Sequence, residues 1–222
     1  MREKRESDFK KIVLLNNKKI IKKFKKVFNK EIQMFAHEIF EAYKLCKIID
    51  DQCKNNEQKQ YVAMYLFNAL NNLISSFNLL ISGYLLPSGN LMRHFTESCA
   101  MAILSSDDNF FQKIKEENTK FPVHKSLDFV FANKKILDIN KNGWIGFNGI
   151  KKIYNDYSHA SLFSISASFL HCRYGEGITK IGPFFDDGKI DYYKKVINER
   201  INAVKSLKNI VNGLKIRINQ KS

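Results

Sequence analysis

The sequence predicts an all-α protein, a helical bundle of about five to seven helices with a small β-hairpin near residues 173–187. Three observations support this fold class. Apolar residues recur every three or four positions through most of the 222-residue chain, which is the spacing of one helix face. Only 10 Gly and 3 Pro are present, too few for the many turns of a β-sandwich or β-barrel. A hydrophobic fraction of 44% excludes a largely disordered chain.

Residues 1–55 are expected to form a basic N-terminal helical segment, followed by a helical bundle core over residues 56–222 in one continuous domain. Helical spacing over residues 9–53 fits one long helix, or two that meet near Asn29, and Asn55-Asn56 ends it. The expected inward stripe is Phe24, Phe28, Ile32, Phe35, Ile39, Tyr43, Cys46 and Ile49.

Positive charge is concentrated at the N-terminus. Residues 1–30 contain twelve Lys/Arg and three Asp/Glu, which gives +9 of the formal net charge of +15. Such a segment can attract nucleic acid or anionic lipid. Abundant Lys, Ile and Asn is also typical of AT-rich codon usage, so both interpretations of the basic balance stay open.

The segment between Lys59 and Arg93 contains no charged residue, and its apolar run is long enough to raise the question of a membrane span. Amide and hydroxyl side chains argue against a span, because they would be buried in hydrocarbon. They fall on one helix face, and apolar residues fall on another. The polar face is Asn68, Asn71, Asn72, Ser75, Asn78 and Ser82; the apolar face is Val62, Leu66, Ala69, Leu73, Phe77, Leu80 and Tyr84. We therefore expect the central helix of a bundle and no transmembrane segment.

The remaining elements are predicted from their start signals. Pro87-Ser88 is expected to begin a helix that runs to about Ser105, with Ser88 as its N-cap. Asp107-Asp108 is expected to cap a short helix, and Pro122 to open another. After a loop with Gly143, Gly146 and Gly149, we expect a helix over about 150–172, the Gly-rich hairpin, and a last helix over roughly 191–218.

The four cysteines, Cys46, Cys53, Cys99 and Cys172, form no CxxC pair and no close Cys/His set. Zinc sites and disulfide frameworks need tighter clustering. No secretory signal follows the basic N-terminus, so reduced thiols in the cytoplasm are expected. The sequence implies no metal and no organic cofactor.

Arg93 and Glu97 lie four residues apart, so they are expected to pair on one helix face. The pair is either a buried ion pair that fixes helix register or a phosphate- or carboxylate-binding Arg93 that Glu97 orients. His94-x2-Glu97 has no second copy, as a di-iron bundle would require.

A second constellation surrounds His159 in the run YNDYSHAS. Tyr154, Asp156 and Ser158 lie within one turn of it, and a serine-lined helix face with Ser161 and Ser164 continues from it. His can act as an acid or base near neutral pH. A hydrogen-bonded packing role for His159 stays open.

Three landmarks carry a family resemblance over roughly residues 60–190: the Leu-x-Arg-x3-Glu helix around Arg93, Tyr-x2-Tyr-Ser-His from Tyr154 to His159, and IGPFFD from Ile181. The chain resembles uncharacterised bacterial all-helical proteins that are similar to the HEPN superfamily. Its ribonuclease members act in toxin–antitoxin, CRISPR and phage-defence systems and carry an Arg, four to six residues, then His, often completed across a dimer.

The resemblance implies metal-independent RNA cleavage, with His159 as the family histidine. Lys152, in Lys152-x6-His159, stands in place of the family arginine and lacks its bidentate fork. Arg93, which the family motif does not include, is a second source of a guanidinium. Glu97 and Tyr154 complete the expected catalytic set.

Two other functions stay open. The first is a non-catalytic helical module that binds a protein partner or a small anionic ligand in a polar groove, lined by Asn68, Asn72, Ser75, Arg93, Ser161 and Ser164. The second is association with a membrane or a nucleic acid through residues 1–30. A homodimer is an expected assembly in the HEPN-like interpretation.

Overall fold

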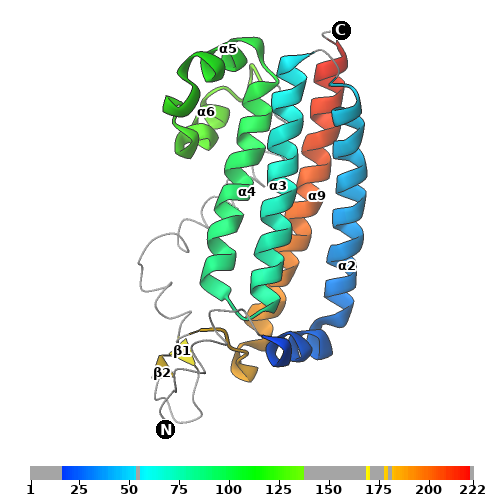
Figure 1. Cartoon of the computed structure of the whole chain (residues 1–222), viewed down its shortest axis with the longest axis vertical. Helices are drawn as coiled ribbons and strands as arrows, with labels where there is room; N and C mark the ends of the chain where they lie inside the picture. Colours follow the sequence, from blue (N-terminus) through cyan, green and yellow to red (C-terminus); the bar gives the residue numbers. More distant parts are fainter. Residues whose placement is uncertain (1–16, 54–55, 138–168, 171–177, 180–181, 221–222) are drawn as a thin grey trace.

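The computed structural model describes residues 17–53, 56–137, 169–170, 178–179 and 182–220. These residues contain six α-helices, three short 3₁₀ turns and two short strands (Figure 1). The helices are α2 (Lys18–Asp51), α3 (Glu57–Ile81), α4 (Leu85–Ser105), α5 (Asp108–Glu117), α6 (Ser126–Ala132) and α9 (Ile190–Gln220). The 3₁₀ turns are η1 (Asn118–Lys120), η2 (Val123–Lys125) and η3 (Asp187–Lys189). The predicted all-α bundle is confirmed.

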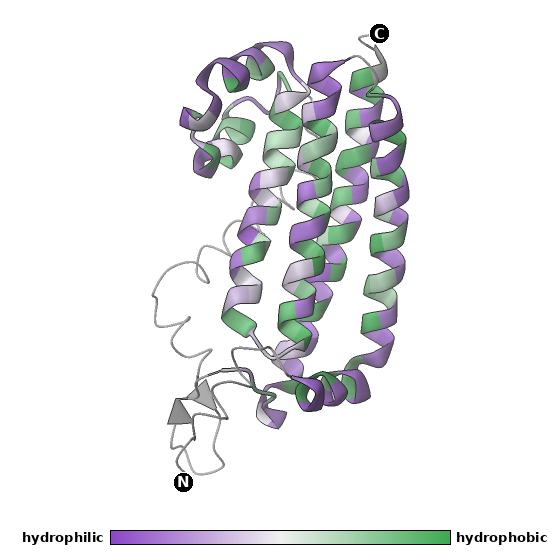
Figure 2. Ribbon diagram, in the orientation of Figure 1, coloured by the Kyte–Doolittle hydropathy of each residue, from purple (hydrophilic) through white to green (hydrophobic). Residues whose placement is uncertain are grey.

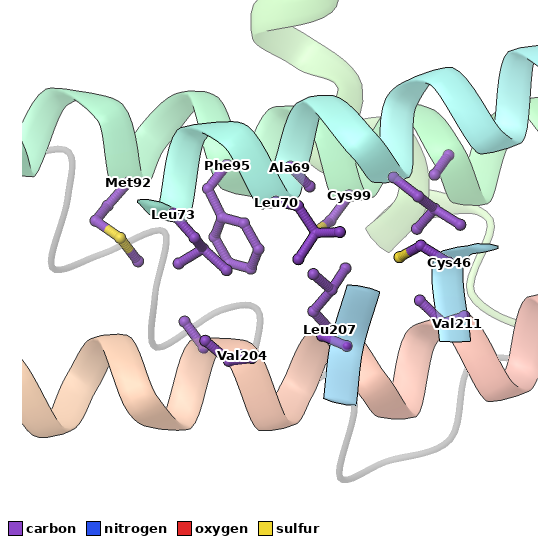
Figure 3. Packing of buried hydrophobic residues seen from close by; sticks show 14 of the residues in the cluster. Cys46, Ala69, Leu70, Leu73, Met92, Phe95, Cys99, Val204, Leu207 and Val211 are labelled. Carbon is purple, nitrogen blue, oxygen red and sulfur yellow. The ribbon is translucent and has the colours of Figure 1, made fainter. Parts of the chain in front are cut away.

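The four long helices α2, α3, α4 and α9 lie side by side, and α5 and α6 pack beside α4 at one end of the bundle (Figure 1). One buried apolar cluster runs through all four long helices. In its centre Leu73 and Phe95 lie opposite Val204 and Leu207 of α9, and Cys46 comes from α2 (Figure 3). Residues 17–53 therefore share the core of the bundle.

Hydrophobic and hydrophilic residues alternate along each long helix (Figure 2). Among the described residues, no helix is both long enough and apolar enough to cross a membrane. The apolar face predicted for α3 is buried from Val62 to Leu80, whereas Asn68, Asn71, Ser75 and Asn78 are exposed. This pattern is that of a helix with one face in a protein core.

Helix α2 bends at Phe28, where φ is −119° and ψ is 29°, next to the predicted junction at Asn29. The segment before Phe28 lies across the lower end of the bundle (Figure 1). The predicted inward position of Tyr43 is wrong, because its side chain is 47% exposed. Ala42 is buried instead, since it lies seven residues from both Phe35 and Ile49 and so falls on the narrow seam that faces α3 and α9.

Helix α3 begins after Asn56, whose side chain accepts a hydrogen bond from the Lys59 N–H. It ends in a Schellman turn: the Gly83 N–H donates to the Leu80 carbonyl and the Tyr84 N–H to the Leu79 carbonyl. Gly83 has a φ of +88°, which favours glycine. A Cβ at Gly83 would lie 2.8 Å from the backbone of Phe184, so the turn also depends on close backbone contact.

The N-cap predicted for α4, Ser88, is wrong by four residues. The helix begins at Leu85, directly after the Gly83 turn, with Tyr84 in the N-cap position. Ser88 is therefore inside the first turns, where its hydroxyl donates to the Leu85 carbonyl at 2.6 Å. The Asp107 cap is confirmed, because its carboxylate accepts from two backbone N–H groups of α5. Pro122 precedes η2 and α6, as predicted.

Strands β1 (Phe169–Leu170) and β2 (Ile178–Thr179) form a two-residue antiparallel ladder. Residues 169–170 therefore contradict the predicted helix over 150–172 at its C-terminal end. Residues 182–187 of the predicted hairpin form no strand. The Phe184 N–H donates to the Gly83 carbonyl at 3.3 Å, and the Asp186 carboxylate accepts from the Gly188 N–H at the start of η3. The last helix is confirmed as α9.

Candidate functional site

Three charged or titratable side chains meet on α4, and we call them the Glu97 cluster: Arg93, His94 and Glu97. Arg93 Nε donates to Glu97 Oε1 at 3.0 Å, and His94 Nδ1 lies 3.4 Å from Glu97 Oε2. Spacings of three and four residues place all three side chains on neighbouring turns. The predicted Arg93–Glu97 pair is confirmed, and the two oxygens of one carboxylate hold two basic side chains.

The cluster lies at the boundary between the interior and the surface. The Glu97 side chain is 11% exposed, that of Arg93 32% and that of His94 61%. Every residue of α4 from Phe95 to Ser105 is buried. A carboxylate at this depth is stable because it is paired, and it can hold a half-buried guanidinium in a fixed orientation.

The polar stripe of α3 meets a different side of α4. Asn68 Nδ2 donates to Ser98 Oγ at 2.8 Å, so Ser98 marks the side of α4 that faces α3. Arg93 precedes Ser98 by five residues, which places it about 140° further round the helix. Asn72 is half-buried and Ser75 is exposed on α3. Arg93 and Ser98 thus lie on different sides of α4, and the groove that was predicted to join Arg93 to Asn68, Asn72 and Ser75 stays a prediction.

The other predicted site residues lie outside the described residues. They are Lys152, Tyr154, Asp156, Ser158, His159, Ser161 and Ser164. Their relation to the Glu97 cluster stays a prediction.

A second polar cluster lies in the core between α3, α4 and α9, and sequence reasoning missed it. Arg200 is fully buried. Its Nε donates to Ser76 Oγ at 2.9 Å and its Nη2 to Ser88 Oγ at 3.0 Å, while its Nη1 donates to the Val196 carbonyl at 2.9 Å. Within the described part of the chain, no carboxylate pairs with it. Each guanidinium nitrogen thus has one neutral acceptor, and these acceptors come from α3, α4 and α9, as a helix-clamping role requires.

His94 was also missed as a member of the site. The sequence does indicate this contact, because the His-x2-Glu spacing places His94 and Glu97 on neighbouring turns of one helix. The lack of a second copy argues against a di-iron site but not against this contact. Arg200 had a signal too, because a basic residue falls on an apolar stripe between Ile197 and Ile201. A charge on an inward-facing position predicts a buried polar network.

The described cysteines are reduced and buried: Cys46, Cys53 and Cys99. Burial raises the pKa of the Cys46 thiol to about 12 and that of Cys99 well above its usual range, which makes both poor nucleophiles. Among the residues that the structure describes, no three His, Cys, Asp or Glu side chains gather closely enough to hold a metal ion.

A groove of about 550 Å³ runs along the outer side of α3 beside the end of α2. Its lining is largely uncharged: Asp50, Gln60, Ala63, Met64, Phe67, Asn68 and Asn71. Met64 is 67% exposed. None of these lining residues is cationic, so the groove is unsuited to a small anion, and its apolar and amide lining suits a peptide or protein surface.

Comparisons with protein-family models, with curated proteins and with solved structures found no match.

Proposed function

We propose that this chain is a HEPN-like helical protein of bacterial defence that binds RNA or cleaves it without a metal. The observation that carries the proposal is the Glu97 cluster, in which one buried carboxylate holds Arg93 and His94. The HEPN resemblance, which spans roughly residues 60–190 and includes this helix, supports the same class of function.

Arg93 is the proposed phosphate-binding residue. A guanidinium matches two phosphate oxygens with its planar fork, whereas a lysine ammonium is a point charge. Glu97 accepts from Nε, so it fixes the plane of the guanidinium. Fixing that plane before the substrate arrives lowers the ordering cost of binding. Glu97 is thus a positioning residue in this proposal.

His159, with Lys152 and Tyr154 near it in the sequence, supplies the proton transfer. In RNA the 2′-hydroxyl is itself the nucleophile when no metal activates water. The base takes the 2′-hydroxyl proton, the oxygen bonds to phosphorus, and the bond to the 5′-oxygen breaks as that oxygen takes a proton. We therefore expect products with a 2′,3′-cyclic phosphate and a 5′-hydroxyl.

The test is cleavage of a mixed tRNA and single-stranded RNA pool in EDTA, with the wild type, His159→Ala, Arg93→Lys and Glu97→Gln. We expect His159→Ala to abolish cleavage and Arg93→Lys to lower kcat/KM by at least about tenfold. Arg217→Lys is the matched control, because Arg217 is also a half-buried arginine with a side-chain partner, Ser106 Oγ at 2.9 Å.

Three results would refute the ribonuclease proposal: no cleavage by the wild type, cleavage that survives His159→Ala, or equal effects of the Arg93 and Arg217 substitutions. Glu97→Gln separates positioning from folding. A positioning role predicts a raised KM with an unchanged melting temperature, whereas a purely structural role lowers the melting temperature and leaves KM unchanged.

The groove beside α3 favours one alternative, a non-catalytic module that binds a protein partner. Its exposed Met64 and its uncharged lining are the specific observation. Met64→Lys should then abolish partner binding while RNA cleavage and stability are unchanged. Loss of RNA cleavage in Met64→Lys would instead connect the groove to the nuclease function.

A further inference from the structure

The first turns of α2 carry a dense positive charge. Seven lysines precede the first acidic residue of the helix, and all seven are exposed. We call them the α2 lysine surface: Lys18, Lys19, Lys22, Lys23, Lys25, Lys26 and Lys30. Lys23 lies 3.6 Å from Asp187, and both side chains are more than half exposed. For the other six lysines, the described residues provide no carboxylate within ion-pair distance.

The apolar side of the same helix segment is occupied by the protein itself. Phe24 is fully buried, with its ring 4.8 Å from Phe185 and 5.0 Å from Tyr193, edge to face in each case. Phe28 is 2% exposed. The bend at Phe28 turns this segment across the end of the bundle (Figure 1). The lysines are therefore presented on a fixed helix.

This packing decides between two kinds of polyanion. A helix that lies on a membrane buries its apolar face at the boundary of the acyl chains. Here that face holds Phe24 and Phe28 in the core, and on the lysine-rich side that is left for a partner, Val27 is the one exposed large apolar residue of the described segment 17–30. A phosphate backbone needs only that side, because its binding comes from charge neutralisation and counterion release.

The spacing of the lysines also fits a nucleic-acid strand. Lys18, Lys22 and Lys26 follow one another at intervals of four residues, or about 6 Å along the helix axis. From Lys18 to Lys26 the helix extends about 12 Å, which is the axial length of roughly three to four phosphates of one strand in a double helix, at ~3.4 Å per phosphate.

We propose that the α2 lysine surface binds the phosphate backbone of a nucleic-acid strand without reading its bases. Stacking on bases needs exposed aromatic rings, and the two rings of this segment, Phe24 and Phe28, are buried. Lysine itself contributes a point charge with no base-specific fork. The identity of the strand as RNA rests on the proposed function; the backbone contact does not.

The experiment compares two variants that lose the same charge. The test variant is Lys18→Gln, Lys22→Gln, Lys25→Gln and Lys26→Gln, which leaves Lys23 in place. The matched control is Lys120→Gln, Lys125→Gln, Lys135→Gln and Lys205→Gln; these four lysines are also exposed and lie outside α2. Both variants keep the same net charge, so a difference between them reports position.

Binding is measured by fluorescence anisotropy with a 2′-O-methyl RNA 20-mer, which lacks the nucleophile for cleavage, between 50 and 200 mM KCl. The logarithm of the binding constant falls linearly with the logarithm of the salt concentration, and each phosphate contact on a single strand makes this slope steeper by about 0.7. The loss of four contacts should therefore reduce the magnitude of the slope by about 3. Over this range the wild type should therefore lose roughly 50-fold more affinity than the test variant, and the control should behave as the wild type.

Equal slopes for the test variant and the control overturn the proposal. So does a wild type that binds phosphatidylserine vesicles but no nucleic acid. A DNA strand of the same sequence should bind within a few-fold of the RNA, and a preference of more than about tenfold for one base sequence contradicts backbone-only contact.

The two proposals fail in different ways. If His159→Ala and Arg93→Lys cleave RNA as the wild type does, or if the wild type cleaves none, the ribonuclease proposal fails. A reduced slope in the lysine variant then still supports binding at the α2 lysine surface. If cleavage depends on His159 and Arg93 but the lysine variant has the salt slope of the wild type, the proposal for the α2 lysine surface fails and the proposed function stands.

Discussion

The buried Arg200 network predicts that removing its acceptors costs more stability than removing the arginine. Ser76 donates to the Ser88 carbonyl at 2.7 Å and Ser88 donates to the Leu85 carbonyl at 2.6 Å. Each hydroxyl therefore gives its only hydrogen to a carbonyl and accepts from the guanidinium. Loss of Arg200 leaves both hydroxyls with an acceptor, whereas loss of the serines leaves charged N–H groups buried without one.

The magnitudes follow from this asymmetry. A hydrogen bond to a charged group contributes about 1.5–3 kcal/mol, and a buried charged donor that loses its partner costs at least as much. Ser76→Ala with Ser88→Ala should therefore destabilise the protein by at least about 3 kcal/mol. Arg200→Met replaces a buried charge with an apolar side chain of similar length, which is often nearly neutral; we expect a change of less than about 1.5 kcal/mol.

The variant that combines all three substitutions is the decisive one. With the guanidinium absent, the two alanines no longer strand a charge, so the combined variant should be more stable than Ser76→Ala with Ser88→Ala. Such non-additivity is the signature of one shared network. If the double alanine variant does not fold, the single serine variants and the combined variant carry the same comparison.

The assay is urea unfolding followed by far-ultraviolet circular dichroism, with slopes compared to confirm the same transition. Ser105→Ala is the control: Ser105 is also buried on α4, but its hydroxyl has no hydrogen-bond partner among the described residues. We expect this substitution to be neutral or stabilising. The reasoning is refuted if Arg200→Met costs as much as the double alanine variant, or if the combined variant is the least stable of all.

Three further predictions follow from other elements. Gly83→Ala should lower the free energy of unfolding in urea by more than about 2 kcal/mol, because φ is +88° and a Cβ would lie 2.8 Å from backbone atoms. Gly213→Ala has open space at its Cβ and should instead raise that free energy by about 0.5–1 kcal/mol. The reverse order would contradict both predictions. Asp107→Ala should cost about 1 kcal/mol through loss of the α5 cap, and Asp107→Asn should recover most of it; equal losses would count against capping. Iodoacetamide at pH 8 should label Cys46 and Cys99 slowly in the native protein and quickly in urea, as measured by peptide mass spectrometry. The reason is that a pKa of about 12 for Cys46 lowers its thiolate fraction on the order of 10³-fold. Fast labelling of the native protein would contradict the burial of these thiols.

Periodicity predicted the helices because each long helix buries one stripe. The stripe of α3 from Val62 to Leu80 is buried where the sequence places it, and the Asp107 cap follows from a local hydrogen bond that the sequence alone specifies. Errors arose where tertiary contacts decide. The start of α4 depends on how Gly83 packs against Phe184, and residues 169–170 form a strand because they pair with residues eight and more positions away.

The candidate site was predictable in part for the same reason. The Arg93–Glu97 contact joins residues four apart on one helix, so the sequence determines it. Where Arg93 lies relative to Asn68 depends on how α4 is rotated against α3, and no pattern within either helix specifies that rotation. The Ser76–Arg200 bond joins residues 124 positions apart, and its only local sign was an arginine on an apolar stripe.

The two arginine clusters differ in what holds the charge, and that difference assigns their roles. Arg200 is fully buried and is bound by two hydroxyls and one carbonyl, so an incoming anion would have to open the core to reach it. Arg93 is half-buried and bound to a carboxylate at the surface boundary. A ligand phosphate can approach the Arg93 guanidinium from the exposed side while Glu97 holds the guanidinium in a fixed orientation. The negative Glu97 carboxylate also repels the negative phosphate. Glu97→Gln removes the charge of this side chain and keeps its shape. If the carboxylate repels the ligand phosphate more than it orients Arg93, this substitution should raise the affinity for the phosphate. A higher KM in Glu97→Gln would show that the orientation of Arg93 is the larger effect.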